Sequence, residues 1–419
     1  MEILRKHQIV TTVFLFLLST SFFGYKGFVE SGMYANFYKY FCILLLIYLS
    51  SSVTNIKGSM SISNMVRYIV IMFVVGIIWA VILRRQSIVS SVNGMAEDLP
   101  LVFFFLFQLL NFENKKMFKA IIICSILYII AFLVSLNTFP NHIFGYSNNL
   151  DAINRSLIDL EERGVLRLNV PGADIVVLLF FMVLTYFRKN KAMYFLLIPI
   201  LIIIFLRGTR TPFFIATSIG VLYLIWKLKF IYKLSVLIVS ITLISFFYSM
   251  YDRILEGTST NPISQYVQLT QAQINSNKND IRTLTTQYFF TQFNDNVLEY
   301  IVGNGKPSGN GTYNMEIRKL ANSKRYYTVD VGFVYIFVYY GIIGLILYLL
   351  LFVIVLKTPV EDNYMFAKLY VIYGYLILPT NVSILWIAPF VFSMNLYIVY
   401  RSSRNLRLKL LKFHDNNEF

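Results

Sequence analysis

The chain has 419 residues, of which 57% are hydrophobic and only 14% are charged. An ordinary soluble domain carries about 25% charged residues, so this composition excludes a typical soluble enzyme and predicts an all-α, polytopic integral membrane protein. The net charge of +16 would suggest a nucleic-acid partner in a soluble protein. In a membrane protein it reflects the excess of Lys and Arg in cytoplasmic loops, and we expect no nucleic-acid partner.

The apolar stretches predict about 12 transmembrane helices, since each needs roughly 20 apolar residues. The first stretch looks superficially like a signal peptide, but no small-residue cleavage site follows it, so we interpret it as the first span. Residues 98–112 are short for a span. The predicted spans are 8–24, 36–53, 67–83, 98–112, 118–136, 172–187, 192–206, 211–227, 233–250, 331–356, 363–380 and 383–400.

Short basic clusters predict the orientation of these spans. The clusters "NKKMFK", "FRKNK", "KLKFIYK" and the tail "RSSRNLRLKLLK" all fall on one side of the membrane, which the positive-inside rule makes cytoplasmic. Both termini are therefore expected in the cytoplasm. The chain then divides into helices one to five (1–136), a first long external loop (137–171), helices six to nine (172–250), a large external loop (251–330), and the last three helices with a basic tail (331–419).

The large external loop is too long for a simple connection and is not low in complexity. In "NDIRTLTTQYFFTQF", Asp280 is placed as a helix N-cap, and Tyr288, Phe289 and Phe293 have roughly helical spacing. The turn-rich stretch "GNGKPSGNG" follows. We expect short helices here that lie on the membrane surface or dip into it.

The turn "FLRGTRTP" places Arg207 and Arg210 between two apolar stretches, on the predicted external side. A helix of about 14 apolar residues covers only about 21 Å of a hydrocarbon core of roughly 30 Å. The turn is therefore expected below the membrane surface, where an arginine without a partner is costly. One interpretation is that the two side chains snorkel to lipid headgroups. The other is that they bind a specific phosphate ligand.

Further arginines lie on the same predicted side. Arg163 and Arg167 occur in "EERGVLRLNVPG", and Arg282 occurs in "NDIRTL". A planar guanidinium matches phosphate oxygens in a bidentate manner, so converging arginines would suit a membrane-embedded diphosphate. For Arg163 a local salt bridge to a neighbouring glutamate is the alternative.

Asp330 stands where the large loop enters the span 331–356. Near arginines, this carboxylate could act as a general base for a sugar hydroxyl. An N-cap role at the start of the helix is the alternative. The three histidines lie in separate segments, and the sequence has no Walker-type loop and no dinucleotide fingerprint. We therefore predict no metal site and no cofactor.

The order of these features resembles the bacterial O-antigen polymerase and ligase superfamily, over roughly residues 163–356. The resemblance is carried by Thr209-Arg210 after a tight external turn, by Arg282 followed by Gly303-Asn304-Gly305, and by Asp330 followed by "GIIG" at 341–344. Ligases of this superfamily usually carry a His at the position of Asp330, whereas polymerases often carry an Asp. This departure favours the polymerase branch.

The resemblance implies a metal-independent glycosyltransferase of the bacterial cytoplasmic (inner) membrane. It would join undecaprenyl-diphosphate-linked oligosaccharide repeat units into O-antigen, as in lipopolysaccharide, or into a capsule-type polymer on the outer face. Donor and acceptor would both be lipid-linked, membrane lipids would surround the protein, and a chain-length regulator protein is a further candidate partner. The implied residues are Arg210 and Arg282 on the diphosphate with Arg167 and Arg207 in support, Asp330 as base, and Tyr326 and Tyr327 stacked on sugars.

Two alternatives remain open. A ligase-type transferase would use similar chemistry with a second lipid as acceptor. A transporter or flippase of lipid-linked saccharides would suit the number of spans, although the chain shows no internal repeat of the kind found in inverted-repeat transporters and carries its longest loop late.

Overall fold

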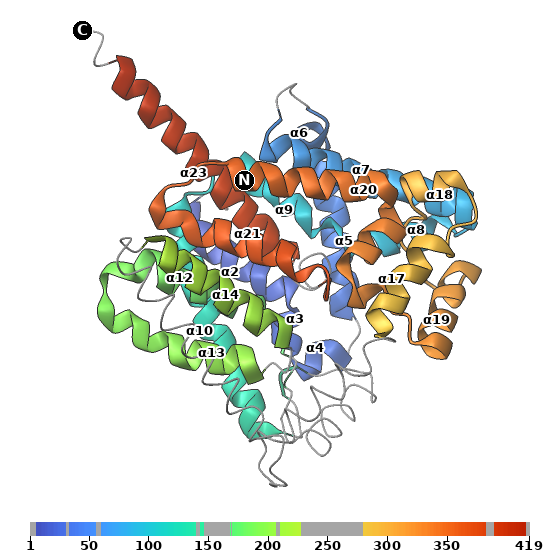
Figure 1. Ribbon diagram of the computed structural model, residues 1–419, viewed down its shortest axis with the longest axis horizontal. Helices are drawn as coiled ribbons and strands as arrows, with labels where there is room; N and C mark the ends of the chain where they lie inside the picture. The colour runs from blue at the N-terminus through green and yellow to red at the C-terminus, as the bar shows by residue number, and fades with distance from the viewer. Residues whose placement is uncertain are drawn as a thin grey trace, which may run out of the picture.

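The computed structural model describes residues 6–30, 33–55, 60–139, 143–145, 168, 170–206, 210–227, 280–382 and 389–415. Within these ranges the regular structure is entirely helical, which confirms the predicted all-α class. The helices pack into one bundle, and the C-terminal part of the last helix projects away from it (Figure 1).

The first half of the described chain holds ten helical elements. They are α2 (Gln8–Ser19), α3 (Ser21–Gly24), α4 (Lys26–Glu30), α5 (Met33–Tyr48), α6 (Ser50–Thr54), α7 (Ile62–Arg84), α8 (Ile88–Met95), η1 (Leu99–Val102), α9 (Phe103–Leu109) and α10 (Asn114–Thr138).

The second half continues with helices on both sides of the predicted large loop. They are α12 (Asp174–Thr185), η2 (Tyr186–Lys189), η3 (Lys191–Leu196), α13 (Leu197–Leu206), α14 (Arg210–Lys227), α17 (Ile281–Thr291), α18 (Val297–Val302), α19 (Thr312–Lys324), η5 (Thr328–Asp330), α20 (Gly332–Lys357), η6 (Asp362–Tyr364), α21 (Met365–Ile377) and α23 (Pro389–Asp415).

Three of the described helices are long and apolar enough to cross a membrane on their own: α7, α10 and α20. A fourth candidate is the pair formed by α8 and residues Leu99–Leu109, which is bent by 59° at its break. Shorter apolar helices coincide with four further predicted spans. The structure thus supports a membrane protein, and the count of about 12 spans stays a prediction. The predicted span 233–250 lies outside the described residues.

The short predicted span 98–112 has a physical explanation. The run "FFFLF" in α9 is enclosed by protein, because Phe103, Phe104, Phe105 and Phe107 are each 0% exposed. The ring of Phe390 from α23 meets Phe103 edge to face at 5.0 Å. By length and composition this run passes as a membrane span only together with α8, and its aromatic side chains pack inside the bundle.

Other helices carry large apolar side chains on their outer faces. Ile78 and Ile82 of α7, Ile126 and Ile130 of α10, and Trp226 of α14 are all more than half exposed. Exposed apolar rows of this kind mark contact with a partner or a membrane. On α7 and α10, which are long enough to cross a membrane, such rows are expected to face lipid.

Candidate functional site

Two clusters of buried charged residues lie where α7 ends at Arg84. Figure 1 shows α8, α17, α18 and α19 grouped around this end of α7, beside the first half of α20. The C-cap of α7 is Arg85, which has a left-handed backbone (φ 50°), and the backbone N–H of this cap donates a hydrogen bond to the carbonyl of Ala80. The chain then reverses into α8. We call this region the Arg84 end.

A break in α20 organises the Arg84 end. Gly341, the first glycine of "GIIG", has φ +64° and interrupts the helix. The carbonyls of Val338 and Tyr339 accept hydrogen bonds from the backbone N–H groups of Asn304 (2.9 Å) and Gly305 (3.0 Å). A broken helix inside a membrane protein needs such replacement partners. The two sequence motifs of the resemblance, Gly303-Asn304-Gly305 and "GIIG", therefore meet in space.

The fit between these motifs requires glycine. A Cβ atom on Gly303 would overlap the backbone nitrogen of Tyr340, and one on Gly305 would overlap the carbonyl oxygen of Gly76 in α7. Gly303 (φ +77°) and Gly305 (φ +67°) also have left-handed backbones, which side chains disfavour. The turn is thus wedged between α7 and α20.

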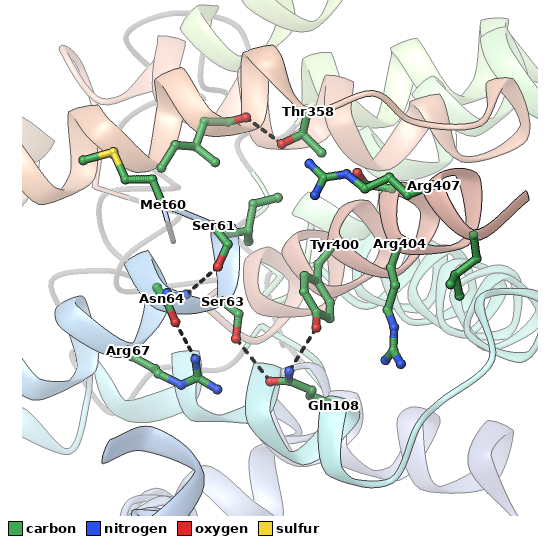
Figure 2. Close-up of a pocket in the computed structure, with 14 residues that line it drawn as sticks. Met60, Ser61, Ser63, Asn64, Arg67, Gln108, Thr358, Tyr400, Arg404 and Arg407 are labelled. Atoms are coloured by element: carbon green, nitrogen blue, oxygen red, sulfur yellow. Dashed lines mark hydrogen bonds between the residues drawn. The ribbon is translucent and has the colours of Figure 1, made fainter. Parts of the chain in front are cut away.

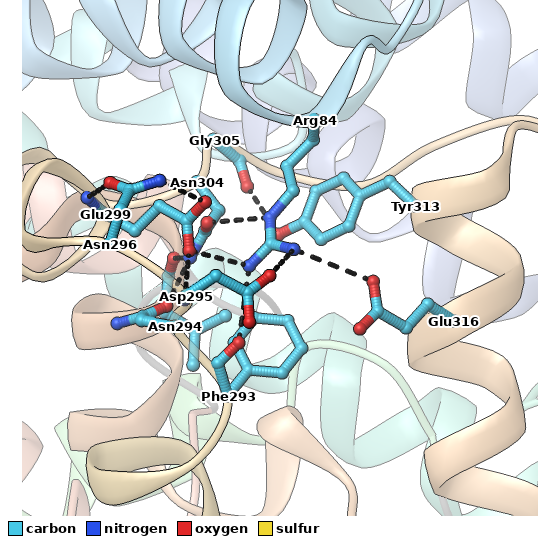
Figure 3. Close-up of polar contacts among 11 residues, drawn as sticks. Arg84, Phe293, Asn294, Asp295, Asn296, Glu299, Asn304, Gly305, Tyr313 and Glu316 are labelled. Carbon is cyan, nitrogen blue, oxygen red and sulfur yellow. Dashed lines mark hydrogen bonds and ion pairs between the residues drawn. The ribbon is translucent and has the colours of Figure 1, made fainter.

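Arg84 lies on one side of this turn, within a cluster of acids from the predicted large loop (Figure 3). Its guanidinium is 3.2 Å from the carboxylate of Glu299, 3.8 Å from Glu316 and 4.0 Å from Asp295. Its Nε donates to Oδ1 of Asn304 at 2.8 Å. The Arg84 side chain is only 10% exposed, so a buried charge is compensated by three carboxylates, from α18, from α19 and from the connection between α17 and α18.

Aromatic rings complete this Arg84 cluster. The guanidinium carbon lies 4.8 Å from the ring centroid of Phe293 and 5.4 Å from that of Tyr313. The Tyr313 hydroxyl donates to the carbonyl of Gly305 at 3.0 Å. Burial raises the pKa of Tyr313 well above its ordinary value, which keeps this donor protonated.

A second buried cluster lies on the other side of the turn. Lys306, only 7% exposed in its side chain, is 2.9 Å from the carboxylate of Glu97 and 3.2 Å from that of Asp98. Asp98 also accepts hydrogen bonds from the hydroxyls of Tyr335 (2.6 Å) and Tyr340. Asp98 stands at the break between α8 and η1, so this Lys306 cluster joins both interrupted helices.

In both clusters the buried cation is already paired with carboxylates. Arg84 and Lys306 each face carboxylates that are already within ion-pair distance, so neither is available to hold a substrate phosphate. Their role is to fix the 280–330 segment against α7 and α8. The sequence analysis missed both. The available signals were "LRRQ" directly after a predicted span and "AED" directly before a buried run.

Arg282 and Asp330 lie on this fixed segment. Arg282 is exposed in the first turn of α17, whose N-cap is Asp280, as predicted, with Oδ1 accepting the Arg282 N–H at 3.1 Å. Asp330 is also exposed and ends η5. The N-cap position of α20 belongs to Val331. The proposed N-cap position for Asp330 is therefore wrong.

Aromatic contacts join the elements that carry these two residues. The ring of Tyr326 lies 5.4 Å from that of Tyr288 in α17. The ammonium of Lys324 lies 5.0 Å and 5.9 Å from the Tyr288 and Tyr326 centroids. Tyr327 is half-buried and occupies the N-cap position before η5. Helix α17 and the turn leading to Asp330 thus form one packed unit. The Tyr326 ring is already in contact with Tyr288 on one side, which leaves less of it for stacking on a sugar.

The remaining predicted arginines flank a described contact. Arg167 and Arg207 lie outside the described residues, and Arg210 is the first residue of α14. Their described neighbours meet, because the N–H of Leu168 donates to the carbonyl of Leu206 at 3.3 Å. The helices on either side of the turn also pack together, since the Phe205 and Phe213 rings are 5.7 Å apart. The predicted helices on either side of "FLRGTRTP" are thus present and packed together, while residues 207–209 lie outside the described residues.

Within the described ranges no group of three His, Cys, Asp or Glu side chains is arranged to hold a metal ion. Neither a protein-family model nor a curated protein matches this chain. The resemblance to the polymerase and ligase superfamily therefore rests on the residues and their order alone.

Proposed function

We propose that this protein is a membrane glycosyltransferase that polymerises lipid-diphosphate-linked oligosaccharide repeat units. The observation that carries the proposal is the hydrogen bond between Leu168 and Leu206. It joins the chain next to Arg167 to the helix end next to Arg207 and Arg210. The described neighbours of Arg167 and Arg207 therefore meet, and Arg210 begins the next helix, which supports a shared diphosphate site for the three arginines.

The chemistry fits the residue types. A hydroxyl of the acceptor sugar attacks the anomeric carbon of the donor, and the bond from that carbon to the diphosphate oxygen breaks. Arg210 and Arg282 stabilise the negative charge that develops on the leaving diphosphate, with Arg167 and Arg207 in support. Asp330 takes the proton from the attacking hydroxyl. No redox partner or cofactor is needed for this balance.

The Arg84 and Lys306 clusters support the proposal through rigidity. Catalytic groups lose rate when they are misplaced by about 1 Å. Arg282 and Asp330 sit on one packed unit that is anchored to α7 and α8 by buried ion pairs. This arrangement suits groups that act on a transition state without moving.

The proposal is tested by three substitutions and one matched control in cells that depend on this protein for their surface polymer. Arg210→Ala, Arg282→Ala and Asp330→Asn should each abolish chains longer than one repeat unit, while the protein still reaches the membrane. Arg318→Ala removes another exposed arginine, from α19, and should leave chain length unchanged. Normal chain lengths from both arginine variants would refute the catalytic assignment, and full activity of Asp330→Asn would refute the base.

A specific observation also favours a second function, the transport of lipid-linked saccharides. Two interrupted helices, α20 and the bent α8–α9 pair, meet at the buried Asp98–Lys306 ion pair. Broken helices of this kind form substrate sites in transporters; here their meeting point is occupied by an ion pair that is already compensated. The two functions differ in whether a new glycosidic bond appears.

A further inference from the structure

The opposite end of α7 holds a cavity of about 510 Å³. Figure 2 shows its polar walls, which come from the start of α7, from α9, from the end of α20 and from α23. Three arginines line it, Arg67, Arg404 and Arg407, and none of the lining residues is acidic. Among the described residues that line it, no carboxylate offsets these three positive charges, and a small concave site of this kind is suited to an anion.

One of the three arginines is buried, and the other two are exposed. Arg67 is 8% exposed and is held in place, because its Nε donates to the carbonyl of Ser52 at 2.9 Å and Nη1 donates to Asn64. Arg404 and Arg407 are exposed and three residues apart on α23. Figure 2 shows the Arg407 side chain pointing toward Ser61, whereas that of Arg404 extends past Tyr400. Among the described residues, the ion pairs on α23 involve neither of them.

Neutral polar groups supply further contacts. The Ser63 hydroxyl donates to Oε1 of Gln108 at 3.4 Å, and Nε2 of Gln108 donates to the Tyr400 oxygen at 3.2 Å. The Tyr400 hydroxyl hydrogen is not used in that contact and can serve a ligand in the cavity. Hydroxyl donors and guanidinium forks together are the groups that recognise phosphate oxygens.

The position of the cavity suggests where the ligand comes from. Helix α7 has 23 residues, which corresponds to about 34 Å against a hydrocarbon core of roughly 30 Å. The cavity and Arg84 therefore lie at opposite membrane faces, and the basic tail assigns the cavity to the predicted cytoplasmic face. Exposed Met60 and Leu408 border it, so a ligand could place acyl chains beside its headgroup.

We propose that this cavity binds a phosphate group, held by Arg67, Arg404 and Arg407. The phosphate could belong to an anionic lipid headgroup or to a soluble phosphate compound. Basic pockets between transmembrane helices on the cytoplasmic side are suited to lipid headgroups. This inference is independent of the proposed glycosyl transfer, because it concerns the other face of the membrane.

The test uses the purified full-length protein in two arms. One arm measures retention of phosphatidylglycerol against phosphatidylcholine by native mass spectrometry. The other titrates inorganic pyrophosphate into detergent-solubilised protein by calorimetry. Each arm compares the wild type with the double variant Arg404→Gln/Arg407→Gln and with Lys409→Gln. Lys409 lies on the same helix, is exposed and pairs with Glu361 at 2.7 Å, and it does not line the cavity, so it controls for the loss of a positive charge on α23 outside the cavity.

We expect saturable binding in at least one arm, weakened roughly tenfold or more in the double variant and unchanged in Lys409→Gln. Binding only in the first arm identifies a lipid headgroup, and binding only in the second identifies a soluble phosphate. Binding that is absent from both arms, or that all three proteins share equally, would overturn the proposal. So would an equal loss in Lys409→Gln. Elution volume and melting temperature without ligand confirm that each variant is folded.

Discussion

At the scale of single residues, the buried charge of Arg84 holds α7 and the 280–330 segment together. It belongs to α7, yet its carboxylate partners Glu299, Glu316 and Asp295 all belong to the 280–330 segment. The contact with Glu299 carries the most weight, because that side chain is only 4% exposed, whereas Asp295 is 84% exposed and its attraction is screened. Removing the arginine would leave Glu299 buried without its cation.

Replacement of Arg84 therefore tests whether these ion pairs stabilise the fold. We expect Arg84→Gln to lower the free energy of unfolding by about 3 kcal/mol or more, since breaking a buried pair leaves an uncompensated charge. Chemical unfolding of the detergent-solubilised protein measures the change. The neighbouring Arg85 is exposed, so Arg85→Gln provides the control and should change stability by less than about 0.5 kcal/mol. Equal effects of the two substitutions would show that the Arg84 ion pairs do not stabilise the fold.

Lys306 allows a test of pairwise coupling. Lys306→Met should cost about 3–5 kcal/mol, because it strands the fully enclosed Asp98 carboxylate. Adding Asp98→Asn removes that charge and should restore part of the loss, since the Asn oxygen can still accept from one tyrosine hydroxyl. A double-mutant cycle of unfolding free energies measures this coupling. Strictly additive effects would argue against the ion pair.

At the scale of helices, the central feature is the junction between the Gly303–Gly305 turn and the break at Gly341. Hydropathy alone predicts one continuous span over 331–356, and α20 does cover almost that range. The interruption arises because the carbonyls of Val338 and Tyr339 bond to a turn that lies more than 30 residues earlier in the chain. A contact partner of that kind is set by tertiary packing and leaves no trace in a local hydrophobic pattern.

A glycine substitution tests whether the Gly303–Gly305 turn packs closely against the backbone of α20. We expect Gly303→Ala to destabilise the protein by roughly 1–3 kcal/mol or more, because a new Cβ meets the Tyr340 backbone and the left-handed φ is strained. Gly311→Ala is the matched control, since a Cβ there meets nothing within 4 Å. Melting temperatures of the purified variants make the comparison. If both variants melt like the wild type, the close approach of the turn to α20 is incorrect.

The same contrast explains what the sequence could predict. Local signals predicted the helix after Asp280, the helices flanking "FLRGTRTP" and the long apolar helices, because caps and hydropathy act over a few turns. The Arg84 and Lys306 clusters escaped prediction because each pairs residues about 200 positions apart. The sequence placed Asp330 directly before a span that was predicted to start at residue 331. Helix α20 starts at Gly332, so its N-cap is Val331 and not Asp330.

At the scale of the whole molecule, α7 separates two chemically different ends. The Arg84 end is rich in compensated charges and carries the exposed Arg282 and Asp330. The opposite end holds the basic cavity with Arg404 and Arg407. If α7 crosses the bilayer, the proposed transfer and the proposed phosphate site face different compartments.

Cysteine labelling tests this orientation. Both native cysteines are buried, so background labelling should be low. Met315 on α19 and Leu410 on α23 are 54% and 63% exposed. In intact cells we expect a membrane-impermeant maleimide to label Met315→Cys, and to label Leu410→Cys only after permeabilisation. The reverse pattern would invert the topology and place the proposed active site inside the cell.

The most direct test of the proposed function is reconstitution of the purified protein with lipid-diphosphate-linked repeat units and no other enzyme. The products are resolved on a gel after extraction of the lipid. The proposal predicts a ladder whose steps are single repeat units and which disappears in Arg282→Ala. Movement of the substrate across the membrane without any new glycosidic bond would contradict the proposed polymerisation and favour transport.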